Sequence, residues 1–198
     1  MKRRIMRMLI GITIASLGIA CLLNSSLGCF AVTAAYKAIS RWFNIPLAVA
    51  NIIIEIIMIY TATKLGEGLG LTAIVNATYG AIMINIFHNV LPHNTILVLG
   101  VFLLPIGWSI IGRAGFGDTG TNILMRAIMK NTGLNVRISR LLVDCTFLII
   151  ASFGAQDYVT WFTIVLTFSY GPLLQIIYNL MGYKPTEVKH EFLITSKH

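Results

Sequence analysis

The amino-acid sequence predicts an all-α, polytopic membrane protein with six transmembrane helices, two short re-entrant or interfacial helices and a 3+3 inverted repeat. Of its 198 residues, 57% are apolar and only 11% are charged, whereas a soluble domain usually has about 25% charged residues. Long apolar runs with charges confined to the gaps between them are typical of multispan membrane proteins. In addition, residues 28–55 and 117–144 share one order of glycine, cation, cation and carboxylate.

Six apolar segments are long enough to cross a hydrocarbon core of about 30 Å, because an α-helix rises about 1.5 Å per residue. They are residues 6–25, 46–65, 70–91, 95–113, 136–154 and 159–181. The connections after the second, third and fifth segments have only a few residues, so the helices that they join are expected to be antiparallel. The first apolar run continues past Cys21, and we therefore interpret it as an uncleaved span rather than a signal peptide.

Two further segments, residues 29–43 and 118–132, are amphipathic and carry two cations each. At about fifteen residues they are too short and too polar to cross a bilayer. We expect each to form a re-entrant or interfacial helix.

The distribution of Lys and Arg predicts the orientation. With six spans and a cytoplasmic N-terminus, thirteen cations lie inside: Lys2, Arg3, Arg4, Arg7, Lys64, Arg113, Arg126, Lys130, Arg137, Arg140, Lys184, Lys189 and Lys197. Only Lys37 and Arg41 lie outside. This bias has the sign of the positive-inside rule, so both termini are expected in the cytoplasm.

The two halves of the chain align without a gap from residue 28 to residue 55 when the second is shifted by 89 residues. The paired positions are Gly28 and Gly117, Lys37 and Arg126, Arg41 and Lys130, Asn51 and Arg140, and Glu55 and Asp144. Each half then contains three spans, so the halves must have opposite orientations, as in many secondary transporters. We expect repeats at residues 1–92 and 93–183 and a cytoplasmic tail at 184–198. The alternative is a coincidental match between amphipathic segments.

Two carboxylates, Glu55 and Asp144, lie about nine residues into a predicted span. An unpaired carboxylate there would cost several kcal/mol or stay protonated. Arg140 precedes Asp144 by one helical turn and can pair with it, whereas Glu55 has only Asn51 at that spacing and could exchange a proton. We place all four in a substrate or ion pathway. The alternative is that the carboxylates only hold the two halves together.

A glycine-rich turn from Gly112 to Asn122 precedes the second short helix. Polar side chains there can cap the helix, and glycines allow another backbone or a ligand to come close. A helix N-terminus also suits an anion or a polar headgroup. The alternative is a tight turn without a ligand. The candidate pathway residues of this turn and its counterpart are Gly28, Gly117, Asp118, Thr119, Thr121 and Asn122.

The remaining polar candidates are cations at span ends and amides within spans. Arg113, Arg126, Lys130 and Arg137 are expected to contact anionic lipid; the alternative is recognition of an anionic solute or headgroup, for which Arg137 and Arg140 are best placed. The pathway candidates in the third span are Asn85 and His88, although polar groups in spans most often bond across helices. The tryptophans that include candidate interfacial anchors are Trp42, Trp108 and Trp161.

No catalytic or cofactor motif is present. There is no HExxH, GxSxG, paired CxxC or nucleotide-binding loop, and Cys21, Cys29 and Cys145 lack metal-ligand spacing. We therefore expect no enzyme activity, no metal and no cofactor. The net charge of +8 is concentrated at span ends, which indicates a membrane surface rather than nucleic acid as partner.

The segments LNSSLGCFAVTAAYKAIS and RAGFGDTGTNILMRAI each place a glycine before a short helix. On these segments, and over nearly its whole length, the chain resembles the YczE/YyaS/YitT family of bacterial integral membrane proteins. The resemblance implies a bacterial cytoplasmic membrane and transport, and it carries over no site residue. Many family members have a proline soon after the glycine, where this chain has Phe30 and Thr119.

These observations together predict a small transporter that moves a polar or anionic solute through a site between two inverted halves. Its carboxylates are the candidates for coupling transport to protons. One alternative is the substrate-capturing membrane subunit of a larger importer, as in vitamin uptake. Another is an accessory membrane protein that does not transport. The expected partners are the lipid bilayer, a small solute, and either a second copy or transporter subunits.

Overall fold

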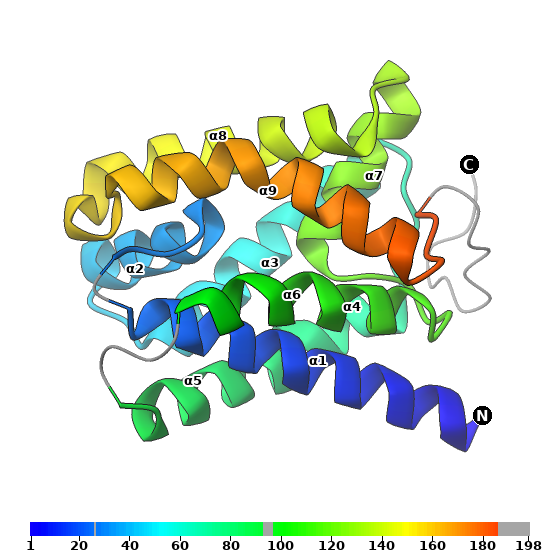
Figure 1. Cartoon of the computed structure of the whole chain (residues 1–198), viewed down its shortest axis with the longest axis horizontal. Coiled ribbons are helices and arrows are strands. Elements are labelled where there is room, and N and C mark those ends of the chain that lie inside the picture. The colour runs from blue at the N-terminus through cyan, green and yellow to red at the C-terminus, as the bar shows by residue number, and fades with distance from the viewer. Residues whose placement is uncertain (26, 93–96, 186–198) are drawn as a thin grey trace.

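The computed structural model describes residues 1–25, 27–92 and 97–185, and its long helices run roughly side by side along the longest axis of the molecule (Figure 1). All regular structure in these residues is helical. The α-helices are α1 (Lys2–Leu23), α2 (Ala31–Phe43), α3 (Leu47–Lys64), α4 (Leu71–Val75), α5 (Ala81–Val90), α6 (Leu97–Gly112), α7 (Gly120–Thr132), α8 (Val136–Gly154) and α9 (Trp161–Leu180). A π-helix η1 (Asn76–Gly80) joins α4 to α5, and a 3₁₀ turn η2 (Gln156–Tyr158) precedes α9.

Four helical segments are long and apolar enough to cross a membrane. They are Lys2–Leu23, Leu47–Lys64, Leu71–Val90 and Trp161–Leu180. The apolar part of α6 is shorter, and α8 has 19 residues but carries three charged side chains, Arg137, Arg140 and Asp144. A helical segment is thus present at each of the six predicted spans, whereas length and composition alone assign four of them.

The two short helices are present where they were predicted, and each begins in the interior of the molecule. Both α2 and α7 have 13 residues. Residues 28–36 and 114–123 are buried, whereas the final residues, such as Phe43 and Thr132, are exposed. This burial of the N-terminal turns favours a re-entrant helix over one that lies flat on the surface.

The helix bounds repeat at the predicted spacing. Both bounds of α7 lie 89 residues after the corresponding bounds of α2. The two C-caps, Asn44 and Gly133, are both left-handed, with φ of 49° and 72°. Gly28 and Gly117, which precede the short helices, also both have positive φ, at 111° and 97°. The two segments thus share helix bounds and backbone conformations at an offset of 89 residues.

Helices α1 and α6 pack closely along a seam of glycines. Gly11 faces Gly107, where an added Cβ on Gly107 would lie 2.7 Å from the Gly11 carbonyl oxygen. Gly18 faces Gly100, where an added Cβ on Gly18 would lie 3.1 Å from the Gly100 carbonyl oxygen. Because the residue numbers run in opposite directions, the two helices are antiparallel. Small residues allow this close approach of helices in membranes.

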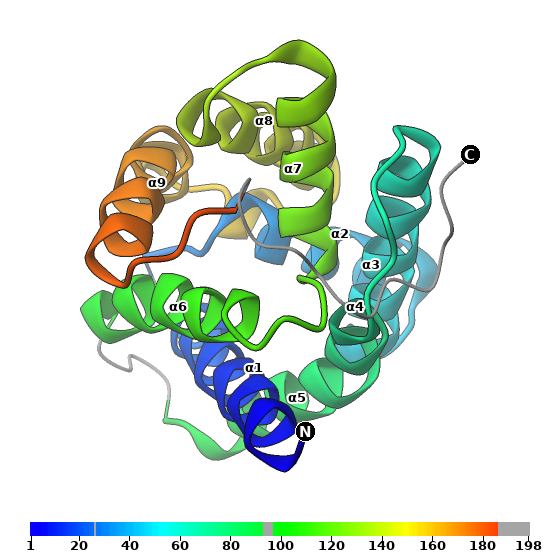
Figure 2. The same ribbon diagram turned by 90° about the vertical axis from the view of Figure 1, so that its right-hand side faces the viewer.

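Each short helix packs on a long helix of the other half. Helix α2 lies against α8, and α7 lies against α3 (Figures 1 and 2). The turns before the short helices also contact the other half of the chain. Gly28 lies against Thr160 and Thr163, and Gly117 lies against Gly70. The core of the molecule therefore lies between the halves rather than within either one.

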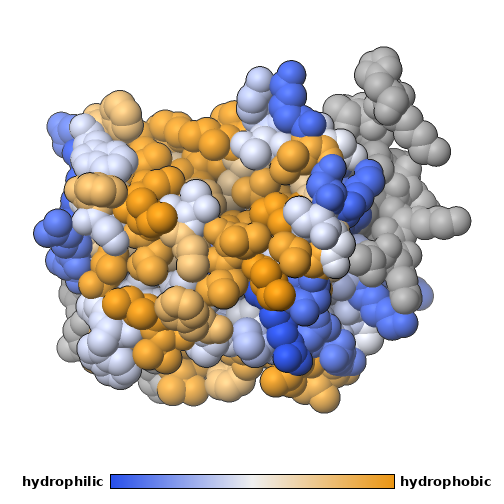
Figure 3. All heavy atoms as spheres, turned by 90° about the horizontal axis from the view of Figure 1, so that it is seen from above, coloured by the Kyte–Doolittle hydropathy of each residue, from blue (hydrophilic) through white to orange (hydrophobic). Residues whose placement is uncertain are grey.

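The surface is apolar along its middle and hydrophilic at both ends (Figure 3). At the end that holds the N-terminus, Arg4 donates to the carbonyl of Ala114 and Lys130 to that of Gly66. At the other end, Arg41 pairs with Asp157. These cations therefore lie at the two ends of the molecule. Residues 186–198, with Lys189, Lys197 and most of the predicted tail, lie outside the described residues.

Candidate functional site

A buried polar cavity lies where the helices of both halves meet. Its volume is about 20 Å³, which is enough for one water-sized occupant. Residues of α1, α2, α3, η1, α5 and α6 and the start of α7 line it. The polar lining residues are Ser16, Asn51, Glu55, Asn76, Thr119 and Thr121, and the aromatic ones are Tyr36 and Trp108. We call this space the central cavity.

The Glu55 carboxylate is held in the central cavity by two neutral donors. Its side chain is 3% exposed. The backbone N–H of Gly120 donates to Oε2 at 2.9 Å, and the Asn76 amide donates to Oε1 at 3.2 Å. Gly120 is the first residue of α7, where backbone N–H groups have no partner within the helix. An added Cβ on Gly120 would lie 2.4 Å from Glu55 Oε2, so a larger residue here would displace the Glu55 carboxylate or the start of α7.

The π-helix η1 supplies the second donor, since Asn76 is its first residue. Single π-helical turns inside α-helices occur frequently at functional sites. The two donors, Gly120 in the first turn of α7 and Asn76 in η1, are 65 and 21 positions away from Glu55 in the sequence. Neither donor follows from the local spacing around Glu55.

Two further oxygens of the central cavity lack hydrogen-bond partners among the described residues. They are Asn51 Oδ1 and Thr119 Oγ1. Asn51 is 2% exposed and Thr119 is 1% exposed, so water at the molecular surface does not satisfy them. Buried polar atoms are usually paired, so these two oxygens are available to a ligand in the cavity.

Arg140 and Asp144 form the buried ion pair that their spacing predicts. Arg140 Nε lies 2.8 Å from Asp144 Oδ2, and the two side chains are 1% and 3% exposed. The guanidinium carbon is 4.6 Å from the ring centre of Trp108 and 5.2 Å from that of Tyr170. Trp108 also lines the central cavity, so the ion pair is separated from it by one aromatic ring. Trp108 is thus a buried residue of the site and not an interfacial anchor.

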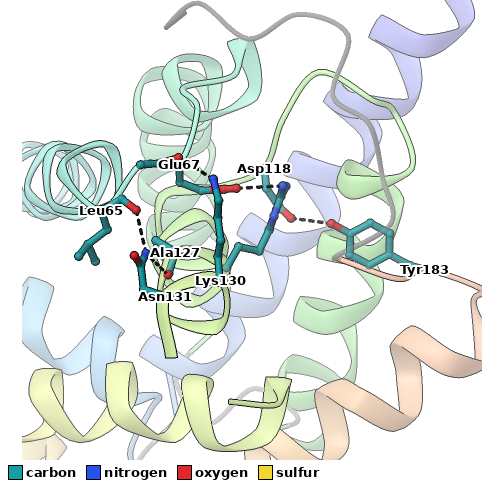
Figure 4. A network of polar contacts seen from close by, with 9 residues as sticks. Leu65, Glu67, Asp118, Ala127, Lys130, Asn131 and Tyr183 are labelled. Carbon is teal, nitrogen blue, oxygen red and sulfur yellow. Dashed lines mark hydrogen bonds and ion pairs between the residues drawn. The ribbon is translucent and has the colours of Figure 1, made fainter. Parts of the chain in front are cut away.

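Asp118 has a different role from Glu55, because it fixes the start of α7. Its carboxylate accepts hydrogen bonds from the Thr119 N–H at 2.9 Å, from the Asn122 amide at 2.8 Å and from the Tyr183 hydroxyl at 2.8 Å. Figure 4 shows the contact between Asp118 and Tyr183. These bonds hold Thr119 and Gly120 in place beside Glu55.

A polar network joins the other end of α7 to the turn after α3 (Figure 4). Arg126 pairs with Glu67 at 3.2 Å, and the Asn131 amide donates to the Leu65 carbonyl at 2.8 Å. Arg126 and Lys130 also border a surface groove of about 510 Å³.

Several predicted pathway residues lie away from the central cavity. Asn85 is exposed. His88 lies one helical turn beyond the cavity-lining Ile84, and its Nε2 is 3.3 Å from Lys37 Nζ. Gly28 and Gly117 pack against backbone and hydroxyl groups at separate places. The structure therefore brings together Glu55, Asn51, Thr119 and Thr121 of the predicted set, with Asp144, Arg140, Asp118 and Asn122 as close neighbours.

The cations that were predicted to contact lipid lie toward the end of the molecule that holds the N-terminus. Arg113 donates to the Met181 carbonyl at 3.0 Å, and Arg137 is exposed. Besides Trp108, sequence reasoning missed the cavity residues Ser16 and Tyr36. Ser16 is a small polar residue in an apolar helix and Tyr36 lies in a short amphipathic one, so neither carries a signal of its own.

A metal centre is not evident in the part of the chain that the structure describes, where no three His, Cys, Asp or Glu side chains come together. The polar groups that line the central cavity are instead carboxylate, amide and hydroxyl oxygens, together with N–H groups.

A family model described as "Family of unknown function (DUF6198)" matches residues 2–179. The chain belongs to this family. No curated protein and no solved structure matches it. The DUF6198 description does not refer to the YczE/YyaS/YitT proteins, so that resemblance stays a prediction. The match covers both halves of the chain and the whole central cavity.

Proposed function

We propose that this DUF6198 protein is a small membrane transporter in which two inverted halves move a small polar or anionic solute past the central cavity. The observation that carries the proposal is a buried carboxylate, Glu55, in a polar cavity to which both halves contribute residues. Buried ionisable groups within a membrane-spanning bundle mark substrate or ion pathways.

The glycine seam between α1 and α6 supports the inverted arrangement. At the 89-residue offset, Gly11 corresponds to Gly100, and Gly18 corresponds to Gly107. Because Gly11 faces Gly107 and Gly18 faces Gly100, exchange of the two halves converts each contact into the other. For antiparallel helices this exchange is a rotation about an axis perpendicular to them. Such an axis lies in the membrane plane if the helices span, as in inverted-repeat transporters.

Four helical segments qualify as spans by length and composition alone. The burial of charge in α8 supports counting α8 as a span as well, and α6 then brings the total to six. Arg140 and Asp144 point into the molecule and pair with each other, so they do not meet lipid. Charged residues are tolerated in spans when they face the bundle interior and are paired. Six spans place both termini on the same side, at the end where the cations of α1 gather.

The two corresponding carboxylates are held differently, which supports different roles. Asp144 is neutralised by Arg140 within its own helix. Glu55 receives only neutral donors, one of them from the opposite half of the chain. We therefore assign Glu55 as the coupling carboxylate and the Arg140–Asp144 pair as a fixed wall behind Trp108. Thr119 and Thr121 would contact the solute.

The proposal is tested by measuring flux in proteoliposomes. Pools of amino acids, small carboxylic acids and inorganic phosphate would be applied while transient currents and pH changes are recorded. The wild-type protein is expected to give saturable signals with at least one pool, and Glu55→Gln is expected to abolish them while the protein remains folded. Asn85→Gln, at an exposed position outside the cavity, is the matched control and should transport normally.

Two results would contradict the role of Glu55 as a transport group. One is unchanged flux in Glu55→Gln. The other is an absence of flux from a protein that co-purifies with an ATPase, which would favour the substrate-capturing subunit of a larger importer.

A further inference from the structure

We propose that the central cavity binds a dehydrated monovalent cation of the size of sodium through oxygens of Glu55, Asn51 and Thr119. The cation site is argued from the geometry of the cavity, and its use as a coupling site rests on the proposed transport function. No motif in the sequence indicates such a site.

The first argument is the supply of unpaired acceptor oxygens. Asn51 Oδ1 and Thr119 Oγ1 both belong to cavity-lining residues, and neither has a partner among the described residues. Both residues are at least 97% buried. A cation that binds oxygen would satisfy both atoms together with the Glu55 carboxylate.

The second argument is that these three residues are held next to one another by different elements. Asn51 precedes Glu55 by one turn of α3, which places both on the same helix face. Thr119 directly precedes Gly120, whose N–H donates to Glu55 Oε2 at 2.9 Å. The oxygens therefore belong to adjacent parts of one small cavity.

The third argument is charge. None of the ion pairs among the described residues includes Glu55, and the two donors that it accepts from are neutral. One monovalent cation would neutralise one carboxylate in the interior of the bundle. A proton on Glu55 would also neutralise the carboxylate, but it would supply only one hydrogen-bond donor to the cavity.

The fourth argument concerns which cation fits. Carboxylate, amide and hydroxyl oxygens suit hard cations rather than transition metals. Ca²⁺ takes six to eight oxygen ligands, and Mg²⁺ usually keeps several waters. A cavity of about 20 Å³ with one carboxylate cannot provide either environment. A single dehydrated monovalent ion matches both the volume and the charge.

Trp108 gives the site a built-in reporter. It lines the cavity, whereas the other two tryptophans, Trp42 and Trp161, are exposed. In a variant with Trp42→Phe and Trp161→Phe, fluorescence comes from Trp108 alone. The full-length protein in detergent would be titrated with NaCl at constant ionic strength, with choline chloride as the balancing salt. Thermal unfolding would be followed in the same solutions.

Sodium is expected to change Trp108 emission saturably and to raise the unfolding temperature, while choline has neither effect. Asn51→Ala and Thr119→Val should each weaken the sodium response at least tenfold. Thr119→Ser keeps the hydroxyl and should retain it, which separates loss of the oxygen from loss of the fold. Asn85→Ala and Thr146→Val change the same residue types outside the cavity and should respond as the parent does.

The site is overturned if sodium and choline act alike, or if Asn51→Ala and Thr119→Val respond as strongly as the parent protein. Its failure is distinguishable from that of the proposed function. Sodium binding without solute flux would retain the site and contradict the transporter, whereas solute flux without any sodium effect on Trp108 emission would retain the transporter and contradict the site.

Discussion

At the scale of single residues, the proposed function rests on how one carboxylate, Glu55, is held. Glu55 has no ionic partner on its own helix, and its two hydrogen-bond donors come from the first turn of α7 and from η1. Asp144, at the corresponding position of the other half, is paired with Arg140. The two carboxylates, 89 residues apart, are thus held in different ways, Asp144 by an ion pair and Glu55 by neutral donors.

Replacement of Gly120 with alanine should disturb Glu55 directly. The added Cβ would lie 2.4 Å from Glu55 Oε2, so the carboxylate or the start of α7 must move. We expect a loss of about 1–3 kcal/mol in the free energy of unfolding, as for other overpacked sites. The measurement is denaturant unfolding in detergent micelles. In a Glu55→Ala background the same Gly120→Ala change should cost much less, because the clashing oxygen is gone.

Removal of one partner of the buried ion pair should be more costly than removal of both. Asp144→Asn leaves the buried Arg140 without a counter-charge, and such changes typically cost about 3–5 kcal/mol. The double variant Arg140→Met with Asp144→Leu should cost less than the sum of the two single changes. Additive losses in the same unfolding measurement would show that the two residues do not act as a pair.

At the scale of helices, the architecture depends on close contacts between elements of opposite halves. α1 packs on α6, α2 on α8 and α7 on α3. The first of these contacts requires glycine on both helices. The ends of the short helices are tied down by polar contacts, at Arg126 with Glu67 on one side and at Arg41 with Asp157 on the other.

The glycine seam should not tolerate a larger residue. In Gly107→Val the new side chain would meet the Gly11 carbonyl and Ala15, since even its Cβ would lie 2.7–2.8 Å from these groups. We expect α1 and α6 to separate and the yield of monodisperse protein to fall severalfold in size-exclusion chromatography. Val98→Leu enlarges an exposed residue of the same helix and should leave the elution profile unchanged.

The Arg41–Asp157 pair should make a small, pH-dependent contribution to stability. Hydrogen bonds from the Arg41 guanidinium lower the pKa of the Asp157 carboxyl below its usual range. Stability from the pair is therefore complete above the unfolded-state pKa of about 3.9 and is lost as the pH falls through the lower folded-state value. Both side chains are about half exposed, so the contribution should be at most about 1 kcal/mol.

This pH dependence is measured by comparing the parent protein with Asp157→Asn. The difference in unfolding temperature should be constant between about pH 5 and pH 7 and should shrink below about pH 4. A difference that instead grows toward acid pH would contradict the assigned pairing.

At the scale of the whole molecule, the positions of the helices could be predicted from the sequence but the site could not be predicted in full. The apolar runs and the rarity of charge within them located the helices, and the paired charges at Glu55 and Asp144 revealed the 89-residue spacing. The Arg140–Asp144 pair could be predicted because its two residues are one helical turn apart in the sequence.

The partners of Glu55 could not be predicted because they are distant in sequence. Gly120 and Asn76 reach it only after α7 and η1 have folded against α3. Trp108 was not predicted in the site for a related reason: tryptophans are typical of the membrane interface, and only the packed structure places Trp108 beside Arg140. Asn85 is exposed and His88 lies one helical turn beyond the cavity-lining Ile84, so a polar character in this span was not sufficient to predict a cavity residue.

The central claim is that the cavity around Glu55 lies on a path that opens to both sides of the membrane. It is tested most directly by labelling Ser16→Cys, a cavity position, with a membrane-impermeant thiol reagent in inside-out and right-side-out vesicles. The background would carry Cys21→Ala, Cys29→Ala and Cys145→Ala. A protein that retains only Cys29, which is fully buried outside the cavity, is the control and should not react. We predict labelling of Ser16→Cys from both sides. Labelling from neither side in the folded protein would contradict the account and make the cavity a static part of the core.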